Sequence, residues 1–279
     1  MEKIQSAIAK ARAARETLGP LGDEAVAGPR GAVTEATIET HVDNEAWNQL
    51  PMIEPSMRRL RAQRIVTLDR TSEASAFDKL RTRILQQMQA NNWRRIAITS
   101  PGPSSGKSTV AMNLAFSLSR QARSRIILSE MDLRKPSMRK ITRLKTERDF
   151  AEVILGNAPF ADHTLRVRSN FALGLLKGPV ASSAELLQDP ALGERLNAIE
   201  AEYEPTVMMF DMPPLQVSDD MMAFGDKVDC VLIIAAAEHT KMAELDICER
   251  ELANVTNVLG IVLNMCRYEA PDASYKYYG

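Results

Sequence analysis

The segment at residues 96–109 constrains the fold of this 279-residue chain more than any other feature. A run suited to a strand, Ile96-Ala97-Ile98-Thr99, is followed by a short loop of Gly, Pro and Ser, and Lys107-Ser108-Thr109 then opens a helical pattern. A strand, a glycine loop and a helix amino terminus in this order surround phosphate oxygens with backbone N–H groups. The sequence therefore predicts a phosphate-binding loop, although Pro101 stands where the strict pattern has glycine.

The positions of this loop have separate expected roles. Lys107 is expected to reach the outer phosphates, and the Ser108 hydroxyl is expected to ligate Mg²⁺. A chance match is the alternative, and the flanking strand and helix argue against it. The loop residues predicted to bind the nucleotide are Gly102, Pro103, Ser104, Ser105, Gly106, Lys107, Ser108 and Thr109.

Short apolar runs alternate with longer helical patterns from Arg94 onward, which indicates a parallel sheet flanked by helices. We therefore expect one α/β domain at residues 61–266, a doubly wound, mostly parallel sheet with helices on both faces. The predicted strands are Arg95–Thr99, Arg125–Ser129, Phe171–Leu176, Thr206–Asp211, Cys230–Ala235 and Val258–Asn264. The predicted helices are Lys107–Gln121, Pro190–Tyr203 and Lys241–Ala253, preceded by one whose apolar residues run from Ala76 to Met88.

Composition excludes several classes of protein. Because 45% of its residues are hydrophobic, the chain is not wholly disordered. With 35 basic and 36 acidic residues and a net charge of -1, it is not a bulk binder of nucleic acid, and no nucleic acid partner is expected. Its three cysteines are far apart, which fits a reducing cytoplasm better than a disulfide framework. Because no apolar run approaches the ~20 residues of a membrane span, membrane association is expected only through a partner.

A second motif places two acids at the end of a predicted strand. In Ile126–Pro136 the strand leads into Glu130 and Asp132, and the i, i+2 spacing directs both side chains to one side. Beside a phosphate loop, two such carboxylates can hold hydrated Mg²⁺ and accept a proton from a hydroxyl. An acidic turn that caps the next helix is the structural alternative.

A third motif delivers one aspartate to a strand end. Four apolar residues, Val207–Phe210, precede Asp211, and two prolines at 213 and 214 prevent the strand from continuing. An aspartate at this point of a doubly wound sheet faces the ligand crevice and holds Mg²⁺ directly or through water. A purely structural turn is the alternative.

The amino-terminal part has a different character. Residues 1–18 have the spacing of an amphipathic helix, and residues 19–60 are expected to be a flexible arm. Its one apolar cluster, around Trp47 and Leu50, either folds back onto the domain or docks a partner. The segment 57–64 carries four arginines, which either face anionic lipid or are simply solvated.

Tyrosines gather at the other end of the chain. Four of the five tyrosines lie in the last twelve residues: Tyr268, Tyr275, Tyr277 and Tyr278. The small and polar residues among them predict a flexible tail at 267–279 that can reach an active site in a neighbouring subunit. A surface-packed tail or an oligomer contact is the alternative.

These motifs in this order, ending in Asp211-Met212-Pro213-Pro214, resemble the bacterial tyrosine kinases (BY-kinases) of capsule and exopolysaccharide biosynthesis, within the MinD/ParA-like P-loop superfamily. The resemblance includes Ala184–Leu187 and runs from about Leu60 to the end of the chain. It implies that ATP and Mg²⁺ are the cofactors and that the catalytic residues are Lys107, Glu130, Asp132 and Asp211. It further implies metal ligation by Ser108, Asp132 and Asp211, an adenine contact by Asn264, and tail tyrosines as phosphoacceptors. Apart from the resemblance, four basic residues follow the second motif and either neutralise phosphate charge, bind a partner's acidic tail or are simply solvated: Arg134, Lys135, Arg139 and Lys140.

The chain departs from this family at two places. Glu130 stands where the family usually has aspartate, so a base positioned for tyrosine is shifted by roughly an ångström. The family's Glu-x-x-Arg-x-x-Arg pattern, associated with ring assembly, aligns with Ser75, Asp78 and Arg81, and only the last position matches. The sequence therefore leaves open whether the protein assembles as a ring or as a dimer.

The resemblance implies an autokinase that phosphorylates the tail of another copy and regulates exopolysaccharide polymerisation and export. Its implied partners are a homo-oligomer, a membrane-anchored polysaccharide co-polymerase or activator, and a cognate tyrosine phosphatase. The expected location is the cytoplasm, at the inner face of the cell membrane. The competing hypothesis is a MinD/ParA-like ATPase switch without phosphotransfer, disfavoured because the extra loop lysine of that branch is absent here. A third and weaker hypothesis is a degenerate structural module that has lost nucleotide binding.

Overall fold

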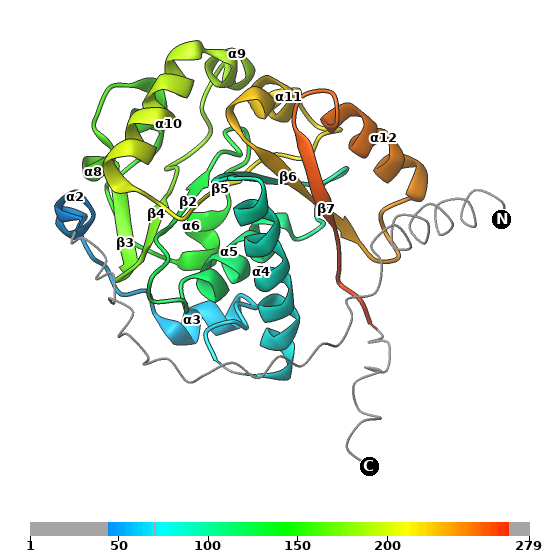
Figure 1. Cartoon of the computed structure of the whole chain (residues 1–279), viewed down its shortest axis with the longest axis horizontal. Helices are drawn as coiled ribbons and strands as arrows, with labels where there is room; N and C mark the ends of the chain where they lie inside the picture. Colours follow the sequence, from blue (N-terminus) through cyan, green and yellow to red (C-terminus); the bar gives the residue numbers. More distant parts are fainter. Residues whose placement is uncertain (1–43, 70, 268–279) are drawn as a thin grey trace, which may run out of the picture. The chain divides into compact units, whose positions relative to one another are not determined.

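The computed structural model describes residues 44–69 and 71–267 of the chain. Three predictions lie outside these residues: the amphipathic helix at 1–18, the arm up to residue 43, and the tyrosine tail from residue 268. The described part forms one α/β unit, shown in Figure 1.

A seven-stranded sheet organises the unit, in the order β3-β4-β2-β5-β1-β6-β7. All neighbouring strands are parallel except β3 and β4, which are antiparallel. The doubly wound, mostly parallel sheet that the sequence predicts is therefore confirmed. The strands are β1 (Arg95–Thr99), β2 (Ile126–Glu130), β3 (Thr164–Arg168), β4 (Phe171–Gly174), β5 (Val207–Asp211), β6 (Cys230–Ala236) and β7 (Asn257–Asn264).

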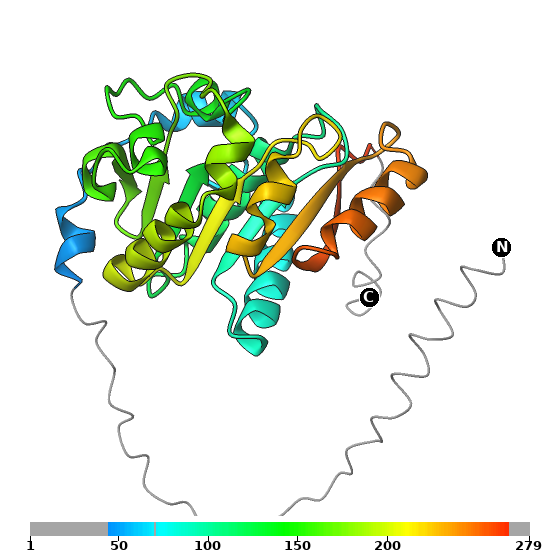
Figure 2. The same ribbon diagram turned by 90° about the horizontal axis from the view of Figure 1, so that it is seen from above.

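Helices cover both faces of the sheet, as Figures 1 and 2 show from two directions. One face is packed by α3 (Met57–Ala62), α4 (Ser72–Ala90), α5 (Lys107–Leu118) and α6 (Met138–Thr142). The other face is packed by α2 (Glu45–Gln49), α7 (Ala151–Leu155), α8 (Phe160–His163), α9 (Ser183–Gln188), α10 (Pro190–Tyr203), α11 (Asp220–Phe224) and α12 (Met242–Leu252), with a 3-10 turn at Gly225–Lys227. No helix in the described ranges is both long and apolar enough to cross a membrane.

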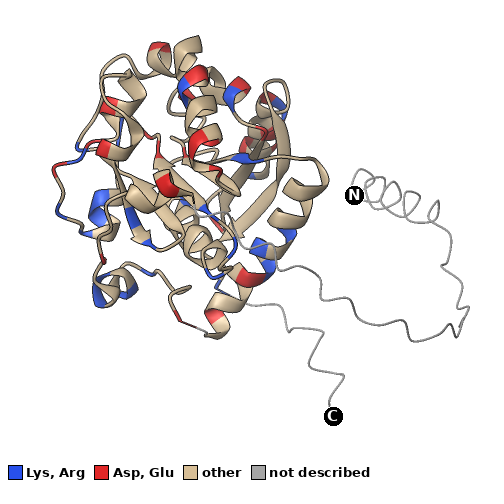
Figure 3. Ribbon diagram, turned by 60° about the vertical axis from the view of Figure 1, so that its left-hand side comes forward, with Lys and Arg blue, Asp and Glu red and all other residues tan. Residues whose placement is uncertain are grey.

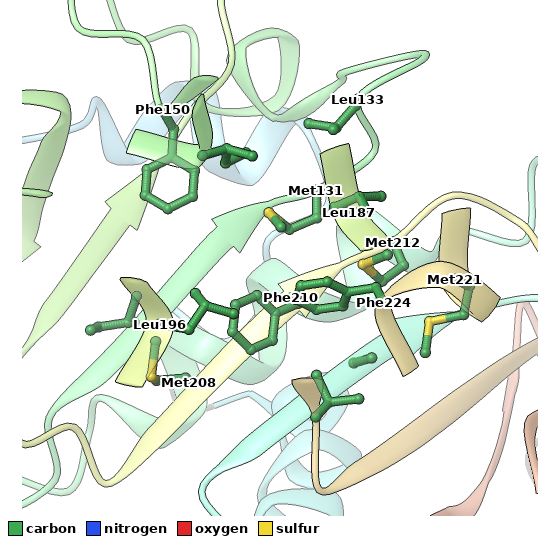
Figure 4. Packing of buried hydrophobic residues seen from close by; sticks show 14 of the residues in the cluster. Met131, Leu133, Phe150, Leu187, Leu196, Met208, Phe210, Met212, Met221 and Phe224 are labelled. Carbon is green, nitrogen blue, oxygen red and sulfur yellow. The ribbon is translucent and has the colours of Figure 1, made fainter. Parts of the chain in front are cut away.

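The central strands are apolar because both of their faces are buried. Along β5, Val207 and Met209 belong to one core cluster, whereas Met208 and Phe210 belong to the cluster on the opposite face. Figure 4 shows the second cluster, in which the Phe210 ring lies edge-on to Phe224 with ring centroids 5.1 Å apart. An uninterrupted hydrophobic run is thus what a parallel strand between two helical layers requires.

The segment 44–60 differs from the prediction of a flexible arm up to residue 60. Trp47 and Leu50 are buried in the core, and the Trp47 indole N–H donates to the carbonyl of Ser169 at 2.7 Å. Beyond them, Met52 forms a parallel bridge to Arg166 at the outer edge of β3. The prediction was wrong for these residues because burying an indole and covering a sheet edge outweigh the local lack of periodicity. The alternative that this apolar cluster folds back onto the domain is confirmed.

The order of the strands decides where a ligand can bind. Strands β2, β5 and β1 are neighbours at the centre of the sheet, and their carboxyl ends lead into the loops that start at residues 131, 212 and 100. In doubly wound sheets the crevice beyond these ends is the ligand site. The three motifs predicted from the sequence therefore meet at one place.

Candidate nucleotide site

The loop between β1 and α5 has the backbone that a phosphate cradle needs. Gly106 is left-handed (φ 81°) and caps α5, and a Cβ added there would lie 2.5 Å from Nδ2 of Asn264. Only glycine fits both constraints. Asn264, at the end of β7, donates from Nδ2 to the carbonyl of Ser105 at 2.8 Å, which anchors the loop to the far strand. The position predicted to contact adenine thus also supports the loop.

A cleft of about 530 Å³ lies over this loop. The second motif and the prolines that follow Asp211 form its other walls. The lining residues are Pro103, Ser104, Ser105, Gly106, Lys107, Ser108, Thr109, Asp132, Arg134, Lys135, Pro136, Ser137, Lys140, Ile141, Pro213, Pro214 and Val217. Of the predicted site residues in the described part, Gly102, Glu130, Asp211 and Asn264 do not line it.

An ion pair joins the first two motifs. Lys107 Nζ lies 2.9 Å from Oδ2 of Asp132, while Oδ1 of Asp132 accepts the backbone N–H of Lys135 at 3.0 Å. Burial lowers the pKa of Lys107, but the carboxylates of Asp211, Asp132 and Glu130 outweigh it and hold that pKa above its ordinary value. The ammonium group therefore stays charged where phosphate would bind.

Asp211 is a buried carboxylate with few polar neighbours. Its side chain is fully buried, and in residues 44–69 and 71–267 no donor meets either carboxylate oxygen with hydrogen-bond geometry, although the Ser108 hydroxyl lies near. Burial raises its pKa, and the nearby charge of Lys107 and the Ser108 hydroxyl only partly oppose this. An unsatisfied buried carboxylate is costly unless a ligand completes its surroundings. With Ser108 and Asp132 it offers the oxygen donors that Mg²⁺ prefers, so these residues fit a nucleotide-bound Mg²⁺.

Both carboxylate oxygens of Glu130, one of the predicted catalytic residues, accept hydrogen bonds from the backbone. Its carboxylate is fully buried; one oxygen accepts the backbone N–H groups of Ser137 and Met138 (2.6 Å for Met138), and the other accepts that of Leu176 at 3.0 Å. Burial raises its pKa to about 7 despite these three donors. Strand β2 ends at Glu130, so Asp132 lies in the loop that follows and bonds to Lys107. Glu130 also lies close enough to Lys107 to raise its pKa.

Arg134 is also engaged within the chain. It contacts Asp220 at 2.9 Å, a buried carboxylate that accepts the Ser183 hydroxyl at 2.9 Å, and reaches the exposed Asp219 at 3.3 Å. Although Arg134 lines the cleft, much of its charge is thus neutralised by the start of α11. The pattern of basic residues after Asp132 could not reveal these partners, which lie some eighty residues further along the chain.

Two lining residues had no motif to reveal them as site residues. The hydroxyl of Ser137 lies 3.1 Å from that of Ser108, which links the second motif to the expected metal ligand. Lys140 was noted only as one of several basic residues, and within the described ranges its ammonium group has no acidic partner.

Comparison with known proteins identifies similar chains. The chain is 26% identical over 216 residues to the tyrosine-protein kinase YwqD of Bacillus subtilis, covering 77% of this chain and 90% of that protein. It is 26% identical over 225 residues to the succinoglycan biosynthesis transport protein ExoP of Rhizobium meliloti, covering 76% of this chain but 28% of that protein. The crystal structure of the chimerical protein CapA2B2 matches with a TM-score of 0.66 and 23% identity, covering 80% of this chain and 99% of that one.

These comparisons confirm the predicted resemblance to bacterial tyrosine kinases. A family model also matches most of the chain. It is the ParA model, described as NUBPL iron-transfer P-loop NTPase, and it matches residues 92–278, which include all three motifs. The cleft over the phosphate loop, with the Lys107–Asp132 pair and the buried Asp211, is therefore the candidate nucleotide site. The chain belongs to the ParA family of P-loop NTPases.

Proposed function

We propose that this protein is an ATP-dependent protein-tyrosine autokinase that regulates exopolysaccharide polymerisation and export. The observation that carries the proposal is the site itself, in which Lys107 and Asp132 are paired over a phosphate loop and the buried Asp211 accepts no hydrogen bond from the described part of the chain. The similarity to a tyrosine-protein kinase over 90% of that protein's length supports the choice of reaction.

The residues of the cleft would share the work of phosphoryl transfer. The loop N–H groups and Lys107 would stabilise charge on the transferred group. Ser108, Asp132 and Asp211 would hold Mg²⁺, which when bound neutralises charge between the β- and γ-phosphates. The acceptor tyrosine gives up its hydroxyl proton, its oxygen bonds to the γ-phosphorus, and the bond from that phosphorus to ADP breaks.

The proton of that tyrosine would be accepted by Asp132. Both carboxylates of the second motif make hydrogen bonds within the chain, but only Asp132 lines the cleft. A general base has to reach the proton that it removes. Glu130 would therefore act on the reaction only by holding the backbone around Ser137 in place.

The phosphoacceptors would be Tyr268, Tyr275, Tyr277 and Tyr278 in another copy of the chain. The number of copies in the oligomer stays open. At the helix position associated with ring assembly, Asp78 pairs within its own chain with Arg81 at 3.0 Å and Arg120 at 2.9 Å. Further partners would be a membrane-anchored co-polymerase or activator and a cognate tyrosine phosphatase, with the protein at the inner face of the membrane. Similarity to ExoP supports the link to polysaccharide transport.

A nucleotide-dependent switch without phosphotransfer is the second candidate. Membership of the ParA family and the internal role of Glu130 favour it. The iron transfer in the matched model's description is not proposed, because Cys230 and Cys248 are buried in the core and Cys266 stands apart from them.

Intact-mass measurement after incubation with Mg²⁺-ATP tests the proposal. Phosphate-sized increments that map to residues 268–278 are expected, with and without a candidate activator peptide, and none in the Lys107→Met variant. ATP hydrolysis or nucleotide-dependent dimerisation without any increment would replace the kinase by the switch.

A further inference from the structure

One surface of the molecule is far more basic than the whole chain. The segments 54–69 and 135–149 together carry ten basic and four acidic residues, although the full chain has 35 and 36. These segments contain α3 and α6, which contact each other; in Figure 1 α3 lies low in the molecule and α6 nearer its centre. Figure 3 shows the Lys and Arg positions of this side in blue. The excess of positive charge is therefore gathered on one surface.

Most of the basic side chains of these two segments are exposed and unpaired. Two nearby acids are already paired, Asp69 with Arg61 at 2.7 Å and Glu147 with Lys177 at 3.0 Å. Seven exposed side chains have no ion pair to any described residue and make up what we call the α3–α6 face: Arg58, Arg59, Arg64, Lys135, Lys140, Arg143 and Lys145. Glu54 is the one exposed acid of these two segments that has no such partner in the described part.

Two of these arginines occupy backbone positions that disfavour a side chain. Arg64 and Arg143 are left-handed, with φ of 61° and 54°, in the turns that follow α3 and α6. Glycine or asparagine adopts this conformation at lower cost. The local backbone conformation therefore does not explain why arginine occupies these two positions.

A groove runs between the two helices. It has a volume of about 560 Å³. Three of its six lining residues are cationic; the six are Arg59, Ala62, Gln63, Arg143, Leu144 and Lys145. Charge-assisted hydrogen bonds from arginine and lysine suit a phosphate headgroup. Met57 at the start of α3 is 37% exposed and adds an apolar contact at the rim of the α3–α6 face.

We propose that the α3–α6 face binds directly to membranes that contain anionic phospholipid. Unpaired lysines and arginines near such a surface each raise affinity, by about fivefold per residue. The seven charges are spread over α3, α6 and the segments beside them rather than gathered in one pocket, so an anionic plane meets more of them than a single acidic peptide does. The inference does not depend on the proposed reaction and removes the need for a partner to bring the chain to a membrane.

The position of Lys140 connects this face with the nucleotide site. Lys140 lines the nucleotide cleft, and the segment that follows its helix α6 carries Arg143 and Lys145 of the groove. A membrane bound to the α3–α6 face would therefore lie beside the cleft. This places the mouth of the site near components that are anchored in the same membrane.

Co-sedimentation of the full chain with vesicles tests the proposal. We expect binding to phosphatidylcholine vesicles that contain phosphatidylglycerol, little binding to phosphatidylcholine alone, and release as NaCl rises from about 0.1 M to about 0.5 M. The triple variant Arg58→Ala, Arg59→Ala, Lys145→Ala should bind on the order of a hundredfold more weakly. A matched triple variant, Arg123→Ala, Lys241→Ala, Arg250→Ala, removes the same charge elsewhere and should bind within about twofold of wild type.

Several outcomes would overturn the proposal. Absence of binding to anionic vesicles would do so, as would equal losses in the two triple variants, because then net charge rather than this face matters. Wild-type binding by the first variant would show that another part of the chain, such as residues 1–43, contacts the lipid. Binding of a poly-glutamate peptide without any binding of vesicles would assign the face to an acidic protein partner. Equal thermal unfolding temperatures of the three proteins exclude misfolding as the cause.

Discussion

Glu130 and Asp211 occupy paired positions on neighbouring strands and yet have opposite surroundings. They are register partners between β2 and β5, and both side chains are fully buried. Glu130 accepts three backbone N–H groups, whereas no donor within the described ranges meets the oxygens of Asp211 with hydrogen-bond geometry. A carboxylate whose acceptors are all used supports the fold, and one whose acceptors are free needs a ligand.

This difference separates stability from function within one small region. The backbone N–H groups that bind Glu130 belong to the start of α6 and to the segment just after β4, so this carboxylate joins two separate parts of the chain. Around Asp211 the nearest cation is Lys107, which already pairs with Asp132. We therefore expect changes at Glu130 to lower stability and changes at Asp211 to lower activity.

The largest expected effect follows from Asp211→Asn. The amide cannot replace a carboxylate that holds Mg²⁺, so the rate of phosphoryl transfer or of ATP hydrolysis should fall by a hundred- to a thousandfold, on the order seen when one charge-stabilising group is lost. The free energy of unfolding without nucleotide should rise by about 1 kcal/mol, because an uncompensated charge is removed. Steady-state kinetics and urea unfolding of the same preparation measure both. A destabilised variant that keeps its activity would contradict the assigned role.

The pH dependence of stability is the next largest effect. The pKa of Glu130 is raised from 4.5 to about 7 in the folded protein, so folding takes up a proton between these values. The contribution of Glu130 to the free energy of unfolding is therefore most favourable below about pH 4.5. It falls by up to about 3 kcal/mol as pH rises to about 7, and is then constant. The raised pKa of Asp211 acts in the same direction. Unfolding in urea at several pH values, without Mg²⁺, should give a flatter profile for Glu130→Gln than for wild type.

Glu130→Gln also has a direct cost, which is separated from the effect of its charge at acidic pH. The new side chain keeps an oxygen for the N–H groups of Ser137 and Met138, but its amino group meets the N–H of Leu176, so two donors face each other. At about pH 5, where Glu130 is neutral in the folded protein, leaving one buried donor unsatisfied should lower the free energy of unfolding by about 2 kcal/mol, whereas near pH 7 the removal of the charge offsets this loss. Asp211→Asn is the matched control, because it removes the same charge from the partner strand. Equal losses of stability in both variants would refute the distinction.

Most of the sheet could be predicted from the sequence because its strands are buried on both faces and therefore appear as plain apolar runs. The predicted strand at 95–99 is confirmed residue for residue, and the helix at 190–203 likewise. Strand β3 was missed although Leu165 and Val167 alternate with arginines, because the run has only five residues and depends on its pairing with β4. Five-residue helices such as α6 carry too few residues for a period and depend on tertiary contacts.

The candidate site shows a similar limit. The motifs bring Lys107, Asp132 and Asp211 together because parallel strands end at one edge of the sheet. Sequence spacing could not tell which acid would be used internally, because the N–H group of Leu176 that binds Glu130 comes from a loop 46 residues away. Periodicity predicts the direction of a side chain only while the strand continues, and here the strand ends between the two acids.

The smallest expected effect concerns Ser137, which touches both regions. Its backbone N–H donates to Glu130, and its hydroxyl lies 3.1 Å from that of Ser108. Ser137→Ala keeps the N–H group, so the free energy of unfolding should change by less than about 1 kcal/mol. Loss of the hydroxyl removes a contact that orients a metal ligand, and the Mg²⁺ concentration for half-maximal activity should rise by about tenfold. A Mg²⁺ titration of activity beside a urea curve separates the two readouts. If stability falls and the Mg²⁺ response does not move, Ser137 belongs to the Glu130 region alone, and the link between fold and site must run through Asp132.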